Sequence, residues 1–408
     1  MPQLSSLQAA PLPSNMEDSY LTSNGPFSTG KIMDPENFFG DIKKALEQGK
    51  LLNVISEFRK MKERLSRASV SIAVTGDTGN GMSSFINALR VVGHEQEDSA
   101  PTGVVRTTQR PTCYSSSSFP YVELWDLPGL GATAQSVESY LEEVKGSQYD
   151  LFIIIASEQF SSNHVQLAKA IQRMGKKFYV VWTKVDRDFN TSALSESQLR
   201  QNVQKNILEN LQKEWVKGPP IFLVCNFDPF SYEFTDLRNV LQNDIFNIRY
   251  NPSLETLYCI CDKSIEARAF YMKDRELTQY LQGALPTGDA EDLQGCLETY
   301  QNLFGVDDAS LQQVAQSVRF GEDVMKYRAD MKSQNFRIAC QRDLGLRLLM
   351  CVAVKKFLGF LGCWFWYGLF NWVISGFQHL RRRRIIEVIA QDTKIILRKI
   401  LEDYMSFL

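Results

Sequence analysis

Short apolar runs alternate with amphipathic stretches through the middle of the chain. Three of the runs are almost continuously hydrophobic, at 151–155, 178–182 and 221–224. Strands of a parallel sheet that is covered on both faces have this composition, because neither face meets water. Helical patterns lie between the runs, at 137–145, 163–174 and 195–215. The alternation predicts an α/β fold built on a parallel sheet.

The regions on either side of this alternating part have other patterns. Residues 1–34 are rich in Ser and Pro and poor in apolar side chains, so we expect a disordered tail. Asp34-Pro35-Glu36 has the N-cap, the proline and the acid of a helix start, which predicts an N-terminal helical segment at 35–66. The α/β domain then takes 67–250. Beyond it only helical periodicity remains, which predicts an all-helical domain at 251–408.

Composition narrows the function classes. The net charge of the 408 residues is −2, which gives no whole-protein argument for binding nucleic acid. Eight scattered cysteines without a pair of CxxC units, and only three histidines, argue against a structural zinc site. The polar N-terminus has no secretory signal, and Pro2 excludes N-myristoylation.

A glycine-rich loop follows the first predicted strand, 70–75, and precedes a predicted helix. Strand, glycine loop and helix form the context of a phosphate-binding loop, whose backbone N–H groups surround an anion. The Ser83 hydroxyl is placed to meet Mg²⁺. Met82 stands where such loops usually carry lysine, and methionine cannot neutralise the β and γ phosphates. The candidate nucleotide-binding residues are Asp77, Thr78, Gly79, Asn80, Gly81, Met82, Ser83 and Ser84.

A second motif, Asp126-Leu127-Pro128-Gly129, ends the next strong strand. Asp126 is placed to reach Mg²⁺ through water. The N–H of Gly129 is placed to meet the γ-phosphate and to report its loss. The next residues are Leu130 and Gly131, so the glutamine with which small GTPases position water is absent here.

Threonines between the two motifs supply the remaining metal candidate. One of Thr102, Thr107 and Thr108 is expected to close over Mg²⁺ in the triphosphate state. We favour Thr108 for this catalytic position, although the spacing alone does not decide among the three.

Two further strand ends carry a guanine-binding pattern. Asp186 follows Thr183 and Lys184, and one carboxylate can accept both adjacent donors of guanine, N1–H and N2–H₂. Lys184 can lay its stem against base and ribose. Cys225 and Asn226 follow the last strand, where backbone N–H groups would cover guanine O6. The ordered set of motifs predicts a site for GTP and GDP.

These motifs together resemble those of the interferon-inducible immunity-related GTPases. Gly81-Met82-Ser83 is similar to the signature of their M, or regulatory, subfamily, in which methionine replaces the loop lysine. Residues 102–105, 125–131 and 183–186 fit as well, and the resemblance extends from about Pro35 to the C-terminus. It implies a dynamin-like GTPase domain held between N-terminal and C-terminal helices.

The resemblance also implies a setting and partners. M-type members lie on the cytoplasmic face of host endomembranes: Golgi, endoplasmic reticulum, phagosome or pathogen vacuole, and autophagosome. There they restrain lysine-type relatives in the GDP state and assist autophagy and the killing of vacuolar pathogens. The implied partners are lysine-type immunity-related GTPases, autophagy factors, anionic membrane lipids and other copies in a homo- or hetero-oligomer. No nucleic acid is implied.

Two functions remain open at this point. The chain is either a nucleotide-gated regulator, whose output is the state of its partner, or an enzyme whose turnover remodels membranes. Met82 and the missing glutamine favour a slow GTPase of the first kind, since both changes remove control of transition-state charge or of water.

An aromatic segment without formal charge occupies 357–378, within a region at about 350–384 that we expect to bind a membrane peripherally. A bilayer span takes about 20 residues, but glycines and polar residues lower the hydropathy here. Trp and Tyr favour the headgroup zone, and the arginines at 381–384 would attract anionic lipid. An interfacial anchor is therefore favoured over a span or a core helix, and the resemblance points the same way. Cys351 and Cys363 are either palmitoylation sites or buried thiols.

Overall fold

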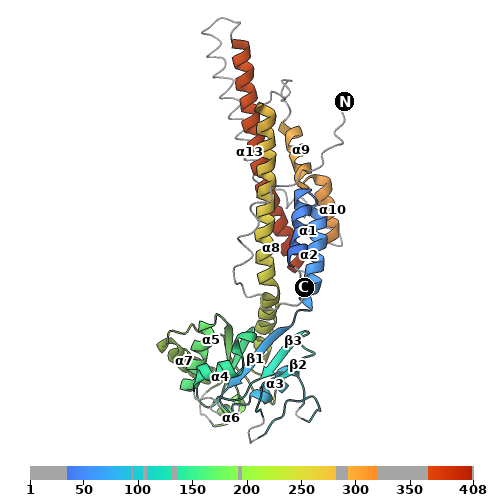
Figure 1. Ribbon diagram of the computed structural model, residues 1–408. Coiled ribbons are helices and arrows are strands. Elements are labelled where there is room, and N and C mark those ends of the chain that lie inside the picture. Colours follow the sequence, from blue (N-terminus) through green and yellow to red (C-terminus); the bar gives the residue numbers. More distant parts are fainter. Residues whose placement is uncertain are drawn as a thin grey trace. The chain divides into compact units, whose positions relative to one another are not determined.

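The computed structural model of the chain describes residues 35–93, 95–103, 108–130, 136–191, 195–281, 293–318 and 366–406. The chain forms two compact units: Glu63–Pro252, and Met1–Lys62 together with Ser253–Leu408. The first is an α/β unit and the second is helical (Figure 1). The α/β fold with an appended helical region is thereby confirmed.

One six-stranded sheet forms the centre of the α/β unit, in the order β2-β3-β1-β4-β5-β6. Neighbouring strands are parallel except for β2, which pairs antiparallel with β3 at the edge. The sequence pattern missed β2 because the strand has only four residues, three of which are exposed. The strands are β1 (Val70–Gly76), β2 (Thr112–Ser115), β3 (Val122–Asp126), β4 (Leu151–Ala156), β5 (Lys177–Trp182) and β6 (Ile221–Leu223).

Helices cover both faces of this sheet, which explains why its central strands are apolar throughout. One apolar cluster joins the sheet to α4, α5 and α7, and the other joins it to α3 and the start of α8 (Phe234–Leu281). All six residues of β4 are buried. The helices are α3 (Met82–Arg90), α4 (Val137–Glu143), α5 (Ser162–Arg173), α6 (Val185–Thr191) and α7 (Glu196–Lys213), with a short 3₁₀ turn η1 (Gly146–Gln148).

The strand register brings the motif loops to one edge. Val74 of β1 lies opposite Asp126 of β3, and Gly76 lies opposite Ile155 of β4. The carboxyl ends of these parallel strands therefore meet at the same edge, where ligands bind in open α/β sheets.

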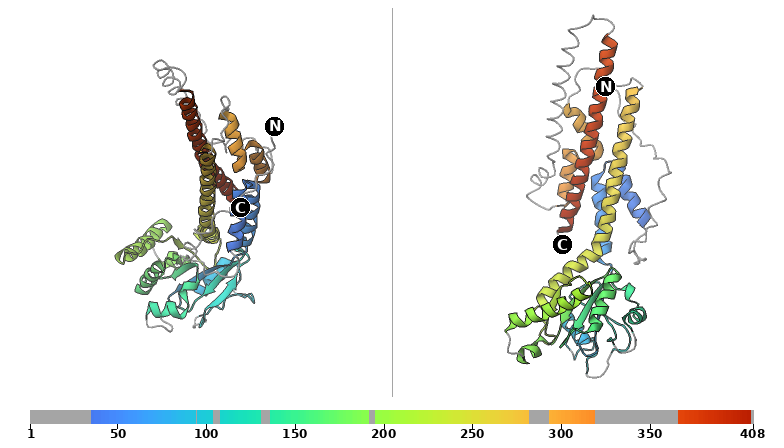
Figure 2. Two further views of the ribbon diagram at one scale, coloured as in Figure 1. Left: turned by 45° about the horizontal axis from the view of Figure 1, so that its top comes forward. Right: turned by 90° about the vertical axis from the view of Figure 1, so that its left-hand side faces the viewer.

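The helical unit joins segments from both ends of the chain (Figure 2). Phe58 of α2 packs edge-on against Tyr404 of α13, with ring centroids 5.7 Å apart, and Arg59 Nε donates to the Tyr404 hydroxyl at 2.8 Å. One long helix, α8, continues through Pro252, although proline removes a helical hydrogen bond there. The elements are α1 (Pro35–Glu47), α2 (Leu51–Ser66), α8 (Phe234–Leu281), α9 (Leu293–Phe304), α10 (Asp308–Val318) and α13 (Trp366–Ser406).

Candidate functional site

The glycine-rich loop lies between β1 and α3, at the carboxyl edge of the sheet. Gly79 and Gly81 have φ angles of 90° and 85°, in the left-handed region that glycine adopts without strain. Gly81 is the N-cap of α3 and has no side chain with which to cap it. The N–H groups of the first helical turn, including those of Ser83 and Ser84, therefore meet the loop without a capping side chain. This arrangement is a site for an anion such as a phosphate group.

Met82 belongs to the hydrophobic core. Its side chain is 8% exposed and lies in the cluster formed by α3 and the sheet, which includes Phe85 and Val74. The methionine is thus accommodated among apolar groups. At this position the chain brings no positive charge to the loop, which leaves phosphate binding there to the backbone N–H groups.

Three oxygen-bearing side chains meet at the start of α3. Ser83 Oγ donates to Asp126 Oδ2 at 2.6 Å, and Thr108 Oγ1 donates to the same oxygen at 2.9 Å. Ser83 and Thr108 are themselves 3.3 Å apart. The structure therefore places Thr108 beside the other two metal candidates. Thr102 is exposed, and Thr107 lies outside the described residues.

The second oxygen of Asp126 makes this corner suitable for a cation. Asp126 is 1% exposed, and its Oδ1 has no hydrogen-bond partner among the described residues. Burial raises the pKa of the carboxyl, although the hydroxyls of Ser83 and Thr108 oppose the rise. An unpartnered buried carboxylate oxygen is costly unless a cation meets it. The oxygens of Ser83, Thr108 and Asp126 therefore fit Mg²⁺, which binds oxygen ligands.

Gly129 lies directly against the phosphate-binding loop. A Cβ on Gly129 would fall 2.5 Å from Thr78 Oγ1 and 2.8 Å from Thr78 Cα, so only glycine fits without displacing the loop. The next residue, Leu130, donates its N–H to the Gly76 carbonyl at 2.8 Å. The Pro128 carbonyl accepts from the buried Tyr140 hydroxyl at 2.9 Å. Gly129 and Leu130 are therefore packed against the phosphate loop; Gly131 lies outside the described residues.

Thr183 and Lys184 reach the phosphate-binding loop from the end of β5. Thr183 Oγ1 donates to the Asn80 carbonyl at 2.6 Å, and Lys184 Nζ donates to the Gly79 carbonyl at 3.0 Å. Lys184 has a φ of 60°, which a residue with a side chain rarely adopts and which is often found at binding sites. The structure thus places Lys184 beside the loop, and its contact with base and ribose stays a prediction.

The remaining guanine-site candidates are brought together from α6 and the loop after β6. Asp186 lies in the first turn of α6, near the buried thiol of Cys225. Burial, the largest cause, and the Asp186 carboxylate raise the pKa of the thiol, although the backbone at Phe227 and Asp228 opposes the rise. Asn226 Nδ2 donates to the Gly81 carbonyl at 3.1 Å. Asp186, Cys225 and Asn226 therefore lie on the same side of the phosphate loop.

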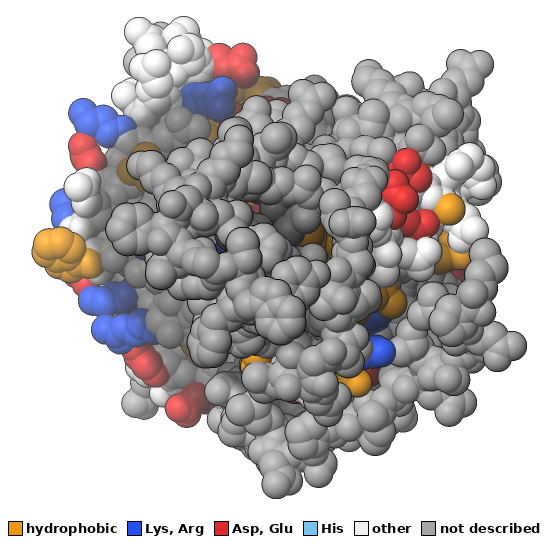
Figure 3. Space-filling view, turned by 90° about the horizontal axis from the view of Figure 1, so that it is seen from above, with side chains coloured by type: hydrophobic (Ala, Val, Ile, Leu, Met, Phe, Trp, Pro, Cys, Tyr) orange, Lys and Arg blue, Asp and Glu red, His pale blue; other side chains and the backbone are white. Residues whose placement is uncertain are grey.

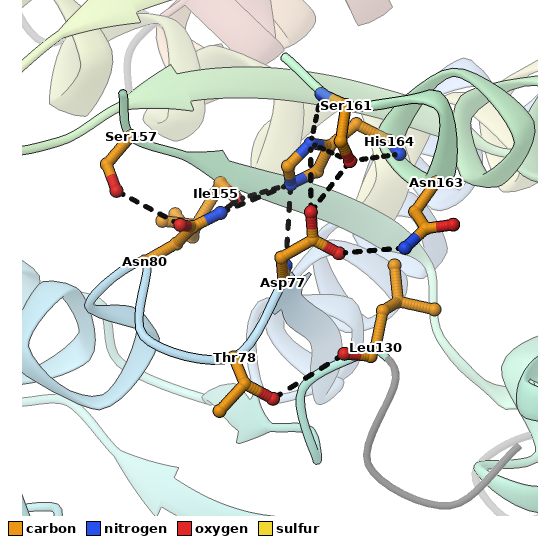
Figure 4. A network of polar contacts seen from close by, with 9 residues as sticks. All are labelled: Asp77, Thr78, Asn80, Leu130, Ile155, Ser157, Ser161, Asn163 and His164. Atoms are coloured by element: carbon orange, nitrogen blue, oxygen red, sulfur yellow. Dashed lines mark hydrogen bonds and ion pairs between the residues drawn. The ribbon is translucent and has the colours of Figure 1, made fainter. Parts of the chain in front are cut away.

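A polar network beneath the loop was missed by the sequence analysis (Figure 4). Asp77 and Asn80 of the loop contact His164 and Ser161 at the start of α5 and Ser157 after β4. The pattern at 163–174 predicted a helix, but it did not show that the first turn of that helix meets the loop. A fully polar start to an otherwise amphipathic helix, Ser161-Ser162-Asn163-His164, was the available signal.

The expected membrane-binding segment is only partly described. Residues 350–365 lie outside the described residues, and side chains of α13 are described only from His379 on. None of the helices that the structure describes has an apolar stretch long enough to cross a membrane. Seen from above, acidic and basic side chains lie beside one another among the residues coloured in Figure 3.

Two of the arginines at 381–384 form ion pairs in the part of the chain that the structure describes. Arg382 Nη1 lies 3.3 Å from Glu276 Oε2, and the two side chains are 12% and 14% exposed. Arg382 is thus paired with a carboxylate of α8, and the contact of the arginines at 381–384 with anionic lipid stays a prediction. Arg384 is more exposed and pairs with Glu387 at 3.0 Å.

Comparison with known proteins extends over both units of the chain. The model of the family described as Interferon-inducible GTPase (IIGP) matches residues 36–400. Immunity-related GTPase family M protein 3 of Mus musculus is 55% identical over 382 residues, which are 92% of this chain and 88% of that protein. Immunity-related GTPase family M protein 1 of Mus musculus is 52% identical over 412 residues, 98% of each chain. The family M protein of Rattus norvegicus is 49% identical over 417 residues, 99% of this chain and 98% of that one.

Proposed function

Since the chain belongs to the interferon-inducible GTPase family, and within it to the M type of immunity-related GTPases, we propose that its nucleotide cycle serves regulation. The protein is a GTPase, which binds GTP and hydrolyses it to GDP. The observation that carries the regulatory proposal is the place of Met82, packed in the hydrophobic core at the position of the usual loop lysine. The family resemblance and the relatives of the M type support it.

The residues of the loop bind phosphate without that lysine. Charge spreads over the γ-phosphoryl oxygens in the transition state of hydrolysis, so a cation at the loop stabilises the transition state more than the bound substrate. Here the field comes from N–H groups of Gly79 to Ser83 and from the start of α3. Hydrolysis is therefore slow, and the chain stays in one nucleotide state long enough to signal it.

Mg²⁺ is the metal that fits the site. Ser83, Thr108 and Asp126 are the residues that would hold it, the first two through hydroxyl oxygens and the third through water on its carboxylate. When bound with GTP, Mg²⁺ neutralises charge on the phosphates. Thr108 belongs to a different segment from Ser83, so a bound metal would join the two segments.

Gly129 is the residue that senses the γ-phosphate in this proposal. Its backbone lies against Thr78, so the Gly129 N–H is placed to meet a γ-phosphate and to report its loss. A partner that contacts Gly129 therefore distinguishes GTP from GDP.

The proposed partners, which would distinguish the GTP state from the GDP state, are lysine-type immunity-related GTPases. We place the encounter on the cytoplasmic face of endomembranes, where the segment at about 350–384 holds the chain peripherally on anionic lipid. There it restrains the partner in its GDP state and supports autophagy and the clearance of vacuolar pathogens. The aromatic composition of 357–378 supports the membrane part of this proposal.

The test is the effect of this chain on a lysine-type relative. Release of bound GDP from that relative is followed by fluorescence, alone and with this chain loaded with GDP or with a non-hydrolysable GTP analogue. We expect slower GDP release in one loaded state only. Equal release in all three mixtures would contradict the regulatory function.

A further inference from the structure

His164 is completely buried beneath the phosphate-binding loop. It is 0% exposed, and its ring stacks on Phe160 with centroids 5.2 Å apart and an interplanar angle of 16°. Burial lowers its pKa, so the ring is neutral at physiological pH. A buried neutral imidazole needs an acceptor for its one N–H and a donor for its other nitrogen.

The partners of the two ring nitrogens determine where the proton lies. The Ser161 N–H lies 3.0 Å from Nδ1 and can only donate, so Nδ1 is the nitrogen with the lone pair. The proton is then on Nε2, which donates to the Ile155 carbonyl at 3.1 Å. The N–H of Asp77 also lies 3.4 Å from Nε2, a longer contact than that between the Ser161 N–H and Nδ1. His164 therefore spans the gap between the start of α5 and the end of β4.

The Ile155 carbonyl, which accepts a hydrogen bond from His164, also accepts one from the phosphate-binding loop. Asn80 Nδ2 donates to the Ile155 oxygen at 3.1 Å and lies 3.3 Å from His164 Nε2. On its other side Asn80 Oδ1 accepts from the Ser157 hydroxyl at 3.0 Å. Asn80 is 9% exposed and stands between Gly79 and Gly81, whose N–H directions decide how phosphate is held. Its side chain thus fixes the middle of the loop from below.

The beginning of the loop is held by the same helix start. Asp77 Oδ2 accepts from the Ser161 hydroxyl at 2.7 Å, and Asp77 Oδ1 accepts from Asn163 Nδ2 at 3.3 Å. Figure 4 shows His164 between these contacts and Asn80. Two points of the loop, Asp77 and Asn80, are therefore tied to one rigid support with His164 at its centre.

We propose that His164 is a positioning residue for nucleotide binding, which holds the phosphate-binding loop in its binding shape through the Ile155 carbonyl and Asn80. The role rests on the proposed use of a loop without lysine. Because Met82 brings no charge, affinity depends on the directions of the backbone N–H groups, and a support that fixes them raises affinity.

The competing explanation is that His164 serves only as a helix cap. Ser161 and His164 form a capping box at the start of α5. The chain offers a matched control, since Ser195 and Gln198 form the same box at the start of α7, away from the loop. Removing Gln198 therefore measures the cost of a lost cap alone.

Substitutions of His164 by amide residues separate its role as a helix cap, through Nδ1, from its role in positioning the loop, through Nε2. His164→Asn keeps an oxygen near the δ position that can accept the Ser161 N–H, but nothing replaces the donor at Nε2. His164→Gln is long enough to place an amide N–H₂ near the ε position. A second variant, Ser157→Ala, weakens the hold on Asn80 from the other side and leaves α5 unchanged.

The experiment measures the affinity of the full chain for a fluorescent GDP analogue, with a melting curve for each variant. We expect about a tenfold loss for His164→Asn, recovery of most of it in His164→Gln, and a loss in Ser157→Ala. In the double variant of His164→Asn and Ser157→Ala, the loss of binding free energy should be smaller than the sum of the two single losses, because both changes act on Asn80. Gln198→Ala should lower the melting temperature with unchanged affinity.

Unchanged affinity in both His164→Asn and Ser157→Ala would overturn the positioning role and leave His164 a cap. Equal losses in His164→Asn and His164→Gln would overturn it as well. Failure of the wild-type chain to bind the analogue would contradict nucleotide binding itself, which is a separate result.

Discussion

Ser83 donates its hydroxyl to Asp126 across 2.6 Å, which joins the first turn of α3 to the end of β3. The same carboxylate oxygen accepts the hydroxyl of Thr108. Three motifs that are separate in the sequence thus meet at one corner beside the phosphate-binding loop. The buried second oxygen of Asp126 makes this corner suitable for a divalent cation.

Replacing Ser83 tests that corner. Ser83→Asn removes the hydroxyl and places a larger amide against Asp126, so we expect Mg²⁺-dependent binding of GTP to be lost. The measurement is GTP affinity with Mg²⁺ and with a chelator. Ser84→Ala, one residue along the same helix turn, is the control and should retain the dependence on Mg²⁺. Wild-type affinity of Ser83→Asn in Mg²⁺ would show that Ser83 is no ligand.

Replacing Asp186 tests the choice of base. The Asp186 carboxylate is predicted to accept two N–H donors of guanine, and Asp186→Asn sets an amide donor against one of them. We expect a loss on the order of 1–3 kcal/mol in guanine-nucleotide binding. The check is competition of GTP, ATP and xanthosine triphosphate for the wild type and the variant. Equal affinity of the wild type for ATP and GTP would contradict the assignment.

Much of this site could be predicted from the sequence because each motif follows a strand. Parallel strands end at one edge, so Ser83, Asp126 and Lys184 had to lie near one another once the strands were recognised. The apolar runs of β4 and β5 made that recognition direct. The short strand β2 was not recognised, because three of its four residues are exposed and only Tyr114 packs against the core.

The network around His164 could not be predicted in the same way. Its contacts join Asn80 to a residue 84 positions later, and no periodicity records which helix start meets the loop. The packing of Met82 could not be predicted either, because a methionine at this position rules out a positive charge but does not indicate where the side chain packs. Only the structure shows that it lies in the core.

The neutral state of His164 predicts acid sensitivity. Burial lowers the pKa of His164 below its ordinary value of 6.5, although Asp77 and the Ile155 carbonyl oppose the shift. Below pH 6.5 the His164 imidazole of the unfolded chain binds a proton more readily than the buried imidazole of the folded chain. The contribution of the neutral His164 to the free energy of unfolding is therefore present above pH 6.5 and is lost as the pH falls. We expect His164→Gln to reduce the loss between pH 7.5 and 5.5 by up to about 1.4 kcal/mol.

The measurement is the unfolding of both proteins at the two pH values. His379, whose pKa burial also lowers, is present in both and cancels in the difference. An equal loss in the wild type and in His164→Gln would show that His164 does not bind a proton on unfolding.

The aromatic segment predicts membrane attachment without a span. Replacing Trp364, Phe365, Trp366 and Phe370 by Glu should release the chain from membranes, because charged side chains oppose burial at the interface. Alkaline carbonate should also extract the wild type. As a matched pair, Arg384→Ala should weaken attachment more than Arg382→Ala, since both arginines are ion-paired but Arg384 is 63% exposed and Arg382 only 12%. Resistance of the wild type to carbonate would indicate a span.

The central claim is that a loop without lysine makes this chain a regulator, and Met82→Lys tests it most directly. GTP carries more negative charge than GDP, so the added cation should raise affinity for GTP more than for GDP and accelerate hydrolysis. Met82→Leu, which keeps the side chain apolar, is the control and should change neither. The measurement is the pair of dissociation constants and the single-turnover rate at matched Mg²⁺. A shift toward GTP with faster turnover in Met82→Lys alone supports the account, and an unchanged preference and rate would contradict it.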